Sequence, residues 1–171
     1  VRDARIAPIY EGTNGIQALD LVGRKMPMHT GRLLKSFFHI VKEYIEKNSF
    51  NYNLNEFMPP LIKSFGRLQQ VTSFIASKGL NNPEEAAGPA TDYLKMFSLV
   101  AIGYVWTQYA EISFNKQNDD PEGFYKAKIA SGKYYMLKIL PETGSIMSSI
   151  LSGAKYYNDF DDKYFDSGFI L

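Results

Sequence analysis

Apolar side chains recur every three or four residues along most of the 171-residue chain, and this period limits the fold more than any other feature. The clearest stripe consists of Leu34, Phe37, Phe38, Val41 and Ile45, and the charged residues around it fall mostly off the apolar positions. No segment shows the strict apolar–polar alternation of a half-buried strand. We therefore predict an all-α protein.

Proline, glycine and asparagine divide this periodic sequence into helical segments. We predict a short motif helix at residues 14–25, long helices at 31–48, 55–77, 91–116 and 121–140, and a last helical segment at 142–158. Short connections join the long helices, which favours neighbours that run in opposite directions. The expected architecture is an antiparallel, up-and-down bundle of four long helices that follows the short motif helix.

Several helix ends carry capping or breaking residues. Thr30 is a plausible cap for the first long helix, and Asp120 for a helix that begins at Pro121. The Pro59–Pro60 pair requires that the second long helix begins near Pro59 or bends there. The segment 91–116 is apolar on more than one face, so we expect the most buried helix there.

Composition narrows the classes of function. The net charge is only +1, and no basic block is longer than Arg24–Lys25, which argues against nucleic-acid binding. The absence of cysteine excludes disulfides and thiol chemistry and fits a reducing cytoplasm. His29 and His39 are not spaced as a ligand pair with a nearby carboxylate, so we predict no metal site. The longest apolar run, Met96 to Trp106, is shorter than the about 20 residues that span a bilayer.

The first seventeen residues contain the clearest candidates for functional residues. Pro8 is expected to stop any helix before it, and Gly12 can take backbone angles that other residues avoid. A helix then begins, with either Thr13 or the pair of Asn14 and Gln17 as its cap. A carboxylate, Glu11, therefore lies just ahead of a helix N-terminus, where free N–H groups favour an anion such as a phosphate. A glutamate in such a position is more often simply a solvated charge.

The residue string itself points to a family. Arg2 to Ile6 (RDARI), followed by Ile9 to Gln17 (IYEGTNGIQ), resembles the C-terminal signature of the acyl-CoA dehydrogenase flavoenzymes. The resemblance implies that Glu11 is the catalytic base and that Gly12 lies against the acyl-CoA. It also implies that FAD is contacted by Thr13, Asn14 and Gly15.

The implied reaction is α,β-dehydrogenation of an acyl-CoA to the 2-enoyl-CoA, as in fatty-acid β-oxidation. An unperturbed glutamate, with a pKa of about 4.3, is a poor base for an α-proton. Burial against an acyl chain and a flavin would raise that pKa toward neutrality, where general-base catalysis gives about 10² to 10⁴-fold. By the same resemblance we expect an electron-transferring flavoprotein as acceptor, a homo-oligomer and a bacterial cytoplasmic location.

The rest of the chain resembles a second part of the same family. The pattern between Lys133 and Ala154 is similar to the C-terminal extension of the longer acyl-CoA dehydrogenases. We therefore predict that residues 1–30 end the catalytic domain and that residues 31–171 form a helical extension domain. The chain alone is expected to be inactive, because the flavin-binding sheet domain is missing. The tail at 159–171 alternates acidic and aromatic residues and is expected to pack on the bundle or to fray.

Three alternatives stay open at this point. An acyl-CoA oxidase would pass the electrons to oxygen, although the Tyr-Glu-Gly-Thr string favours a dehydrogenase. A DNA-associated alkylation-response relative would need a basic face, which the net charge opposes. A membrane-docking bundle would need a Lys/Arg-rich face opposite a clean apolar face, which none of the predicted helices shows.

Overall fold

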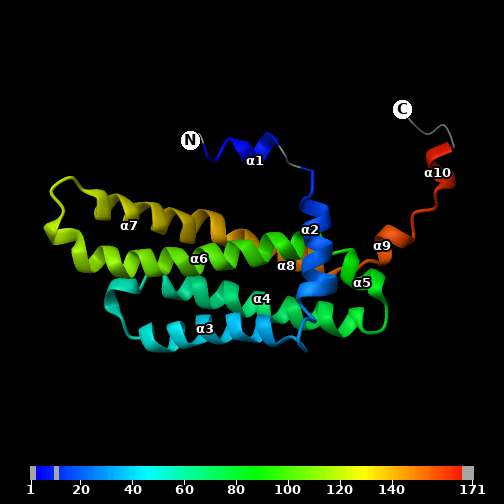
Figure 1. Ribbon diagram of the computed structural model, residues 1–171, viewed down its shortest axis with the longest axis horizontal. Coiled ribbons are helices and arrows are strands. Elements are labelled where there is room, and N and C mark those ends of the chain that lie inside the picture. The colour runs from blue at the N-terminus through cyan, green and yellow to red at the C-terminus, as the bar shows by residue number, and fades with distance from the viewer. Residues whose placement is uncertain (1–2, 10–11, 167–171) are drawn as a thin grey trace.

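The computed structural model describes residues 3–9 and 12–166, and every regular element in these ranges is helical (Figure 1). The α-helices are α1 (Ile6–Ile9), α2 (Asn14–Asp20), α3 (Arg32–Asn48), α4 (Met58–Gly79), α5 (Pro83–Ala87), α6 (Ala90–Lys116), α7 (Phe124–Tyr134), α8 (Thr143–Leu151), α9 (Lys155–Asn158) and α10 (Lys163–Asp166). Two π-helical turns, η1 (Leu21–Lys25) and η4 (Tyr135–Ile139), and three 3-10 turns, η2 (Tyr52–Leu54), η3 (Gln117–Asp119) and η5 (Leu140–Glu142), join them. The all-α prediction is confirmed.

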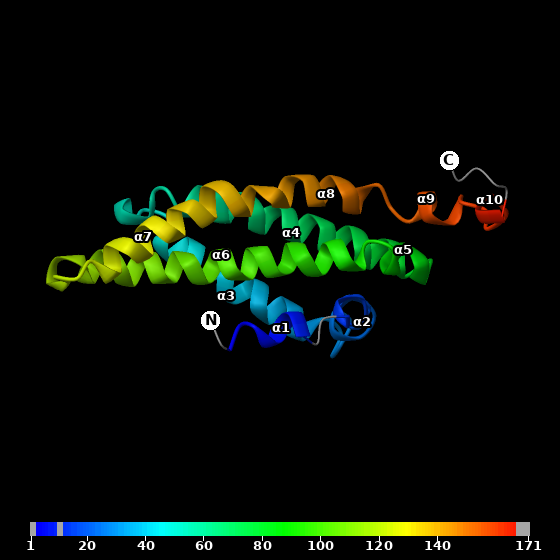
Figure 2. The same ribbon diagram turned by 90° about the horizontal axis from the view of Figure 1, so that it is seen from above.

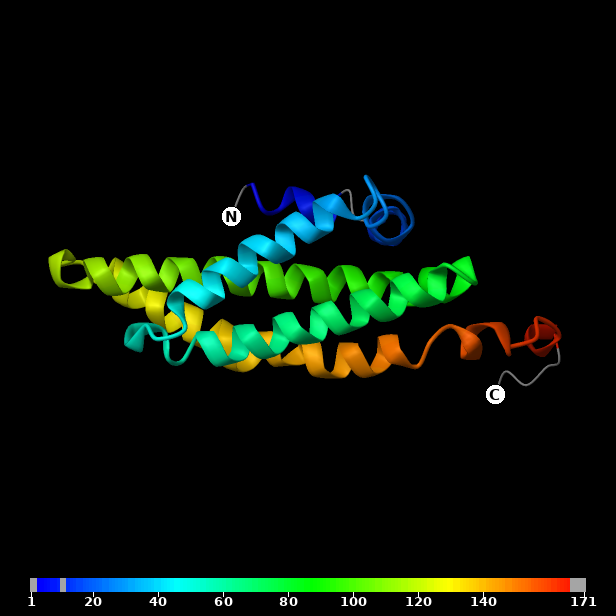
Figure 3. The ribbon, with the colours of Figure 1, turned by 90° about the horizontal axis from the view of Figure 1, so that it is seen from below.

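Long helical rods that alternate in direction form the body of this part of the chain. They are α3, α4, α6 and the continuous run from α7 through η4 and η5 to α8 (Figures 1 and 2). Figure 3 shows that α3 is inclined to the others rather than parallel to them. The predicted up-and-down helical bundle is thus confirmed.

One apolar core runs along the bundle. On α4, Leu61, Leu68 and Ile75 repeat at seven-residue spacing and are at most 1% exposed. Met96 of α6 and Leu140 of the last rod are fully buried members of the same cluster. Because burial of a large apolar side chain contributes about 1.5–3 kcal/mol, this cluster is the main source of the fold's stability.

The first thirty residues contribute to the same core. Ala18, Val22 and Met26 are buried in it, and α2 lies across the direction of the bundle, near the end where α5 joins α6 (Figures 1 and 3). The domain boundary between residues 30 and 31 stays a prediction, because residues on both sides of it share this packing.

A left-handed corner joins η1 to α3. His29, Thr30 and Gly31 have φ angles of 51°, 59° and 74°. Gly31, not Thr30, is the N-cap of α3, so the capping prediction for Thr30 is wrong. A threonine at positive φ is strained. Thr30 forms part of the corner that reverses the chain, and its side chain does not cap α3.

Of two other predicted helix starts, the one near Pro59 agrees with the structure and the one at Pro121 does not. The second long helix begins at Met58, so Pro59 and Pro60 fall in its first turn, where missing N–H groups cost nothing. The predicted start at Pro121 is wrong, because α7 begins at Phe124 after Gly123, whose φ is 78°. Asp120 nevertheless caps this start, since its carboxylate accepts a 2.6 Å hydrogen bond from the backbone N–H of Tyr125.

The last rod changes its helical period twice around Pro141. The π-helical turn η4 buries Tyr135, whose hydroxyl donates a 2.8 Å hydrogen bond to the carbonyl of Leu99 on α6. The 3-10 turn η5 then carries Pro141, which has no N–H to donate. Burial raises the pKa of Tyr135 to about 12.

Helix α6 leaves one apolar face open. Ile102, Val105, Tyr109 and Ile112, which lie three or four residues apart, are 40–49% exposed. The opposite faces of α6 are buried against α4, α7 and α8. The expectation that this helix would be the most buried therefore holds for only part of its circumference.

Candidate cofactor-binding segment

The candidate segment consists of α1, the turn after it and α2. Tyr10 and Glu11, the predicted base, lie outside the described residues, which resume at Gly12. Contrary to the expectation that Pro8 stops a helix, α1 passes through it. A single helical turn tolerates proline because its N–H groups have no intrahelical partner in any case.

Gly12 has a φ of 130°, in the range that favours glycine over any residue with a Cβ. Among the described residues, no heavy atom lies within 4 Å of the place that a Cβ would take at Gly12 or at Gly15. Another molecule can therefore approach the backbone closely on both sides of the start of α2.

Helix α2 begins with polar residues that face solvent. Of the two predicted candidates, Thr13 is the N-cap, and its carbonyl accepts a 2.9 Å hydrogen bond from the N–H of Gln17. The Thr13 hydroxyl caps no backbone N–H in the described part of the chain, so the predicted side-chain cap is not formed. Thr13, Asn14 and Gly15 are all exposed. This arrangement fits a polar cofactor, because the hydroxyl, the amide and the first-turn N–H groups lie on an accessible edge.

The helix has two apolar faces with different environments. Ala18 and Val22 pack into the bundle core, at 0% and 7% exposure. Ile16 and Leu19 are 66% and 51% exposed on the remaining surface. The bundle therefore holds α2 in place, and α2 presents its predicted binding residues beside an uncovered apolar face.

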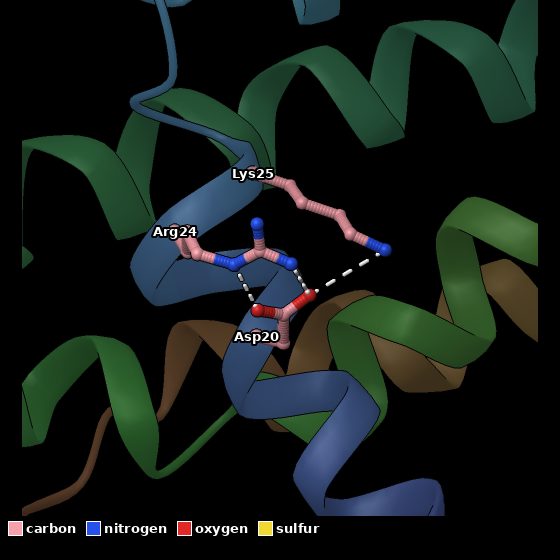
Figure 4. Close-up of polar contacts among 3 residues, drawn as sticks. All are labelled: Asp20, Arg24 and Lys25. Atoms are coloured by element: carbon pink, nitrogen blue, oxygen red, sulfur yellow. Dashed lines mark hydrogen bonds and ion pairs between the residues drawn. The ribbon is translucent and has the colours of Figure 1, made fainter.

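The C-terminal end of α2 carries a charged cluster (Figure 4). The Asp20 carboxylate accepts hydrogen bonds from Arg24 Nε at 2.5 Å and from a second guanidinium nitrogen at 2.9 Å, and Lys25 Nζ lies 3.4 Å from it. The hydrogen bonds from Arg24 lower the pKa of Asp20 below its usual value, and the carboxylate in turn raises the pKa of Arg24.

Sequence reasoning treated Arg24 and Lys25 as the longest basic block and missed their carboxylate partner. The signal was present, because Asp20 and Arg24 are four residues apart and face each other on a helix. Arg24 and Lys25 lie in the π-helical turn η1, which no feature of the sequence predicted.

The sequence of the bundle matches a known family. The family model described as "Acetyl-CoA dehydrogenase C-terminal like" covers residues 37–161. The chain belongs to this family. The resemblance to the C-terminal part of the acyl-CoA dehydrogenases is therefore confirmed, whereas residues 11–15 precede the matched range and their roles stay predictions.

Curated relatives of this acyl-CoA dehydrogenase C-terminal chain agree with the family match. A butyryl-CoA dehydrogenase of Syntrophomonas wolfei is 26% identical over 145 residues, which are 82% of this chain and 24% of the relative. A 3-methylmercaptopropionyl-CoA dehydrogenase of Ruegeria pomeroyi is 28% identical over 156 residues, 87% of this chain and 26% of the relative. The broad-specificity linear acyl-CoA dehydrogenase FadE5 of Mycobacterium tuberculosis is 23% identical over 151 residues, which are 82% of this chain and 25% of the relative. The chain thus spans about a quarter of the length of these relatives.

Two further features are absent from the described residues. None of their helices is long and apolar enough to cross a membrane. Within the same ranges, no three or more histidine or acidic side chains gather where they could hold a metal ion.

Proposed function

We propose that this chain is the catalytic-base turn and C-terminal bundle of an FAD-dependent acyl-CoA dehydrogenase. The observation that carries the proposal is the family match over residues 37–161, together with the upstream Ile9–Gln17 string, which resembles the same family. The relatives support an acyl-CoA substrate, since all of them are named as acyl-CoA dehydrogenases.

Glu11 is the proposed base. Its carboxylate takes the α-proton of the thioester, and the electrons of the broken C–H bond form the new α,β double bond as a hydride leaves the β-carbon. Gly12, at a φ that favours glycine, lets the backbone lie against the thioester without a Cβ between them. When bound, FAD supplies the acceptor for that hydride.

Thr13, Asn14 and Gly15 are the proposed FAD contacts. Their exposure and the open space at Gly15 support this role. The uncovered apolar face of Ile16 and Leu19 next to them supports a site that other parts of a longer enzyme close. Such closure would exclude water and raise the pKa of Glu11 toward the range of a working base.

The direct test replaces Glu11 by glutamine in the full-length enzyme. We expect Glu11→Gln to lower kcat by about 10² to 10⁴-fold, while the flavin absorbance of the purified enzyme is unchanged. Glu122→Gln is the matched control, because Glu122 is an exposed glutamate on the far loop before α7. Near-wild-type turnover of Glu11→Gln would place the base elsewhere.

The remaining proposals concern the whole enzyme. Residues 1–171 alone should neither retain FAD nor oxidise an acyl-CoA. FAD retention or acyl-CoA oxidation by this chain would contradict the proposal that a flavin-binding sheet domain is also needed. We propose a cytoplasmic homo-oligomer that reduces an electron-transferring flavoprotein. Fast reoxidation of the substrate-reduced enzyme by oxygen would point to an acyl-CoA oxidase instead.

A further inference from the structure

The chain after Ala154 forms an arm that leaves the bundle. We define the acidic arm as residues 155–166, which carry four aspartates and two lysines. Ala154 anchors it, since this residue is 2% exposed and its N–H donates to Glu85 Oε2 at 3.2 Å. Beyond that point, α9 and α10 extend past the end of α8 and lie against neither α6 nor α7 (Figures 1 and 3).

The acidic arm exposes aromatic rings. Tyr156, Phe160, Tyr164 and Phe165 are 53–72% exposed. The Phe160 ring lies 5.6 Å from that of Tyr164 and 5.0 Å from that of Phe165, centroid to centroid, so these three form a small cluster. An exposed aromatic cluster of this kind, rimmed by charges, is typical of a docking element.

The open face of α6 offers a receptor for such a cluster. We define the α6 hollow by its lining residues, which are Ala101, Ile102, Val105, Trp106 and Tyr109. The hollow is almost entirely apolar and has a volume of about 320 Å³. At its rim, Lys128 Nζ lies 5.9 Å from the Trp106 ring and 5.3 Å from the Phe124 ring.

The charges around the hollow complement those of the arm. The segment from Phe124 to Ile139, which runs beside α6, carries four lysines and no acidic residue. Lys133 pairs with Glu56. Lys126, Lys128 and Lys138 form no ion pair within residues 3–9 and 12–166. The arm supplies the missing acidic groups, among them Asp159 and Asp162.

We propose that the acidic arm of one copy docks its aromatic cluster in the α6 hollow of a second copy, and that the second copy does the same in return. Such an exchange is a closed two-fold contact, in which each copy gives one arm and receives one. A fully buried ring covers about 150–250 Å². Because the three rings of each cluster are 53–69% exposed, two arms bury about 500–1,000 Å² of ring surface. With the surface of the hollows that they cover, the contact reaches the ~1,200 Å² of a stable interface.

Sedimentation of the 171-residue chain tests the exchange. We expect the unaltered chain to be a dimer, and both a chain that ends at Ala154 and Val105→Glu to be monomers with unchanged helical circular dichroism. Leu80→Glu is the matched surface control, since Leu80 is 87% exposed and belongs to neither the arm nor the lining of the hollow, and it should remain a dimer. For the arm itself, Phe160→Ala should weaken the dimer at least tenfold, whereas Phe50→Ala, at a fully exposed phenylalanine, should not.

A mixing experiment separates exchange from an unspecific loss of association. The chain that ends at Ala154 keeps its hollow, and Val105→Glu keeps its arm, so a mixture of the two should form a heterodimer although neither dimerises alone. This heterodimer is held by one arm instead of two, so it should be weaker than the dimer of the unaltered chain. Lys128→Glu should weaken the dimer, and Asp159→Lys with Asp162→Lys should restore part of the loss. The proposal is overturned by a monomeric unaltered chain, including one whose arm folds back on its own hollow, or by a dimer that survives removal of the arm.

Discussion

The bundle and the motif segment use the same kinds of apolar residue in opposite ways. In the bundle, Leu61 and Leu68 are fully buried, whereas in α1 and α2 Ile9 is 80% and Ile16 is 66% exposed. The bundle therefore has a closed core of its own, although α6 keeps one open face. The motif segment is only half covered, and the residues proposed to meet acyl-CoA and FAD lie in this uncovered half. The proposed catalytic part of the chain would thus depend on contacts that the bundle does not supply.

The largest expected difference between the two regions comes from a matched pair of leucines. Leu68→Ala removes a fully buried side chain and should cost about 2–5 kcal/mol of the free energy of unfolding, because it leaves a cavity. Leu19→Ala, at a residue that is 51% exposed, should cost far less. Urea denaturation followed by circular dichroism measures both. Equal losses would show that the motif segment is packed as tightly as the core.

Two glycines give a second contrast. A Cβ at Gly132 would lie 2.8 Å from the Phe57 ring and 3.3 Å from Trp106, so Gly132→Ala should destabilise the chain by about 1–3 kcal/mol. Gly15→Ala should cause no loss, because space is open there and alanine favours a helix. Thermal denaturation of both variants measures these changes in stability. A neutral Gly132→Ala would mean that α7 can move away from Phe57.

The pH dependence of stability sharpens the comparison within the bundle. Burial raises the pKa of Tyr93 to about 12, and its hydroxyl lies 2.9 Å from that of Thr72. Because the folded pKa lies above the unfolded one, stability is fully present below about pH 10 and falls as the pH rises toward 12. Tyr93→Phe should lessen this fall. Tyr52→Phe, at an 84% exposed residue, should leave it unchanged in urea titrations at each pH.

The smallest effect is expected at the exposed end of the motif segment. Arg24→Gln should raise the pKa of Asp20 toward its usual value, because the hydrogen bonds from Arg24 are the main cause of the lowering. Carboxyl NMR titration measures this change. Stability should hardly respond, since exposed ion pairs contribute little. An unchanged Asp20 pKa in Arg24→Gln would mean that Lys25 can take over.

The order of the helices could be predicted from the sequence because it depends on local period and on breakers. Pro59 and Pro60 marked the start of α4, and Gly79 marks its end. The short helix α5 begins at Pro83 after Asn82, whose Oδ1 accepts a 3.0 Å hydrogen bond from the N–H of Glu84. In these places the deciding interactions lie within a few residues of one another.

The remainder depends on contacts between distant residues. Thr30 looked like a cap, but the corner that joins η1 to α3 forces it to positive φ. The period of α6 predicted burial on more than one face, whereas Val105 and Ile112 are 40% and 49% exposed. The candidate site shows the same limit. Sequence offered Thr13 as one of two N-cap candidates, whereas the proposed closure around Glu11 would depend on chain segments far away in sequence.

The anchoring of α2 through Ala18 and Val22 has a mechanical consequence. The N-terminal end of α2, which carries Thr13 to Gly15, is therefore attached to the bundle through the packing of α2 on α6. A tilt of α6 that this packing transmits would move the proposed cofactor contacts with it. Substitutions deep inside the bundle are therefore expected to disturb the proposed reaction from a distance.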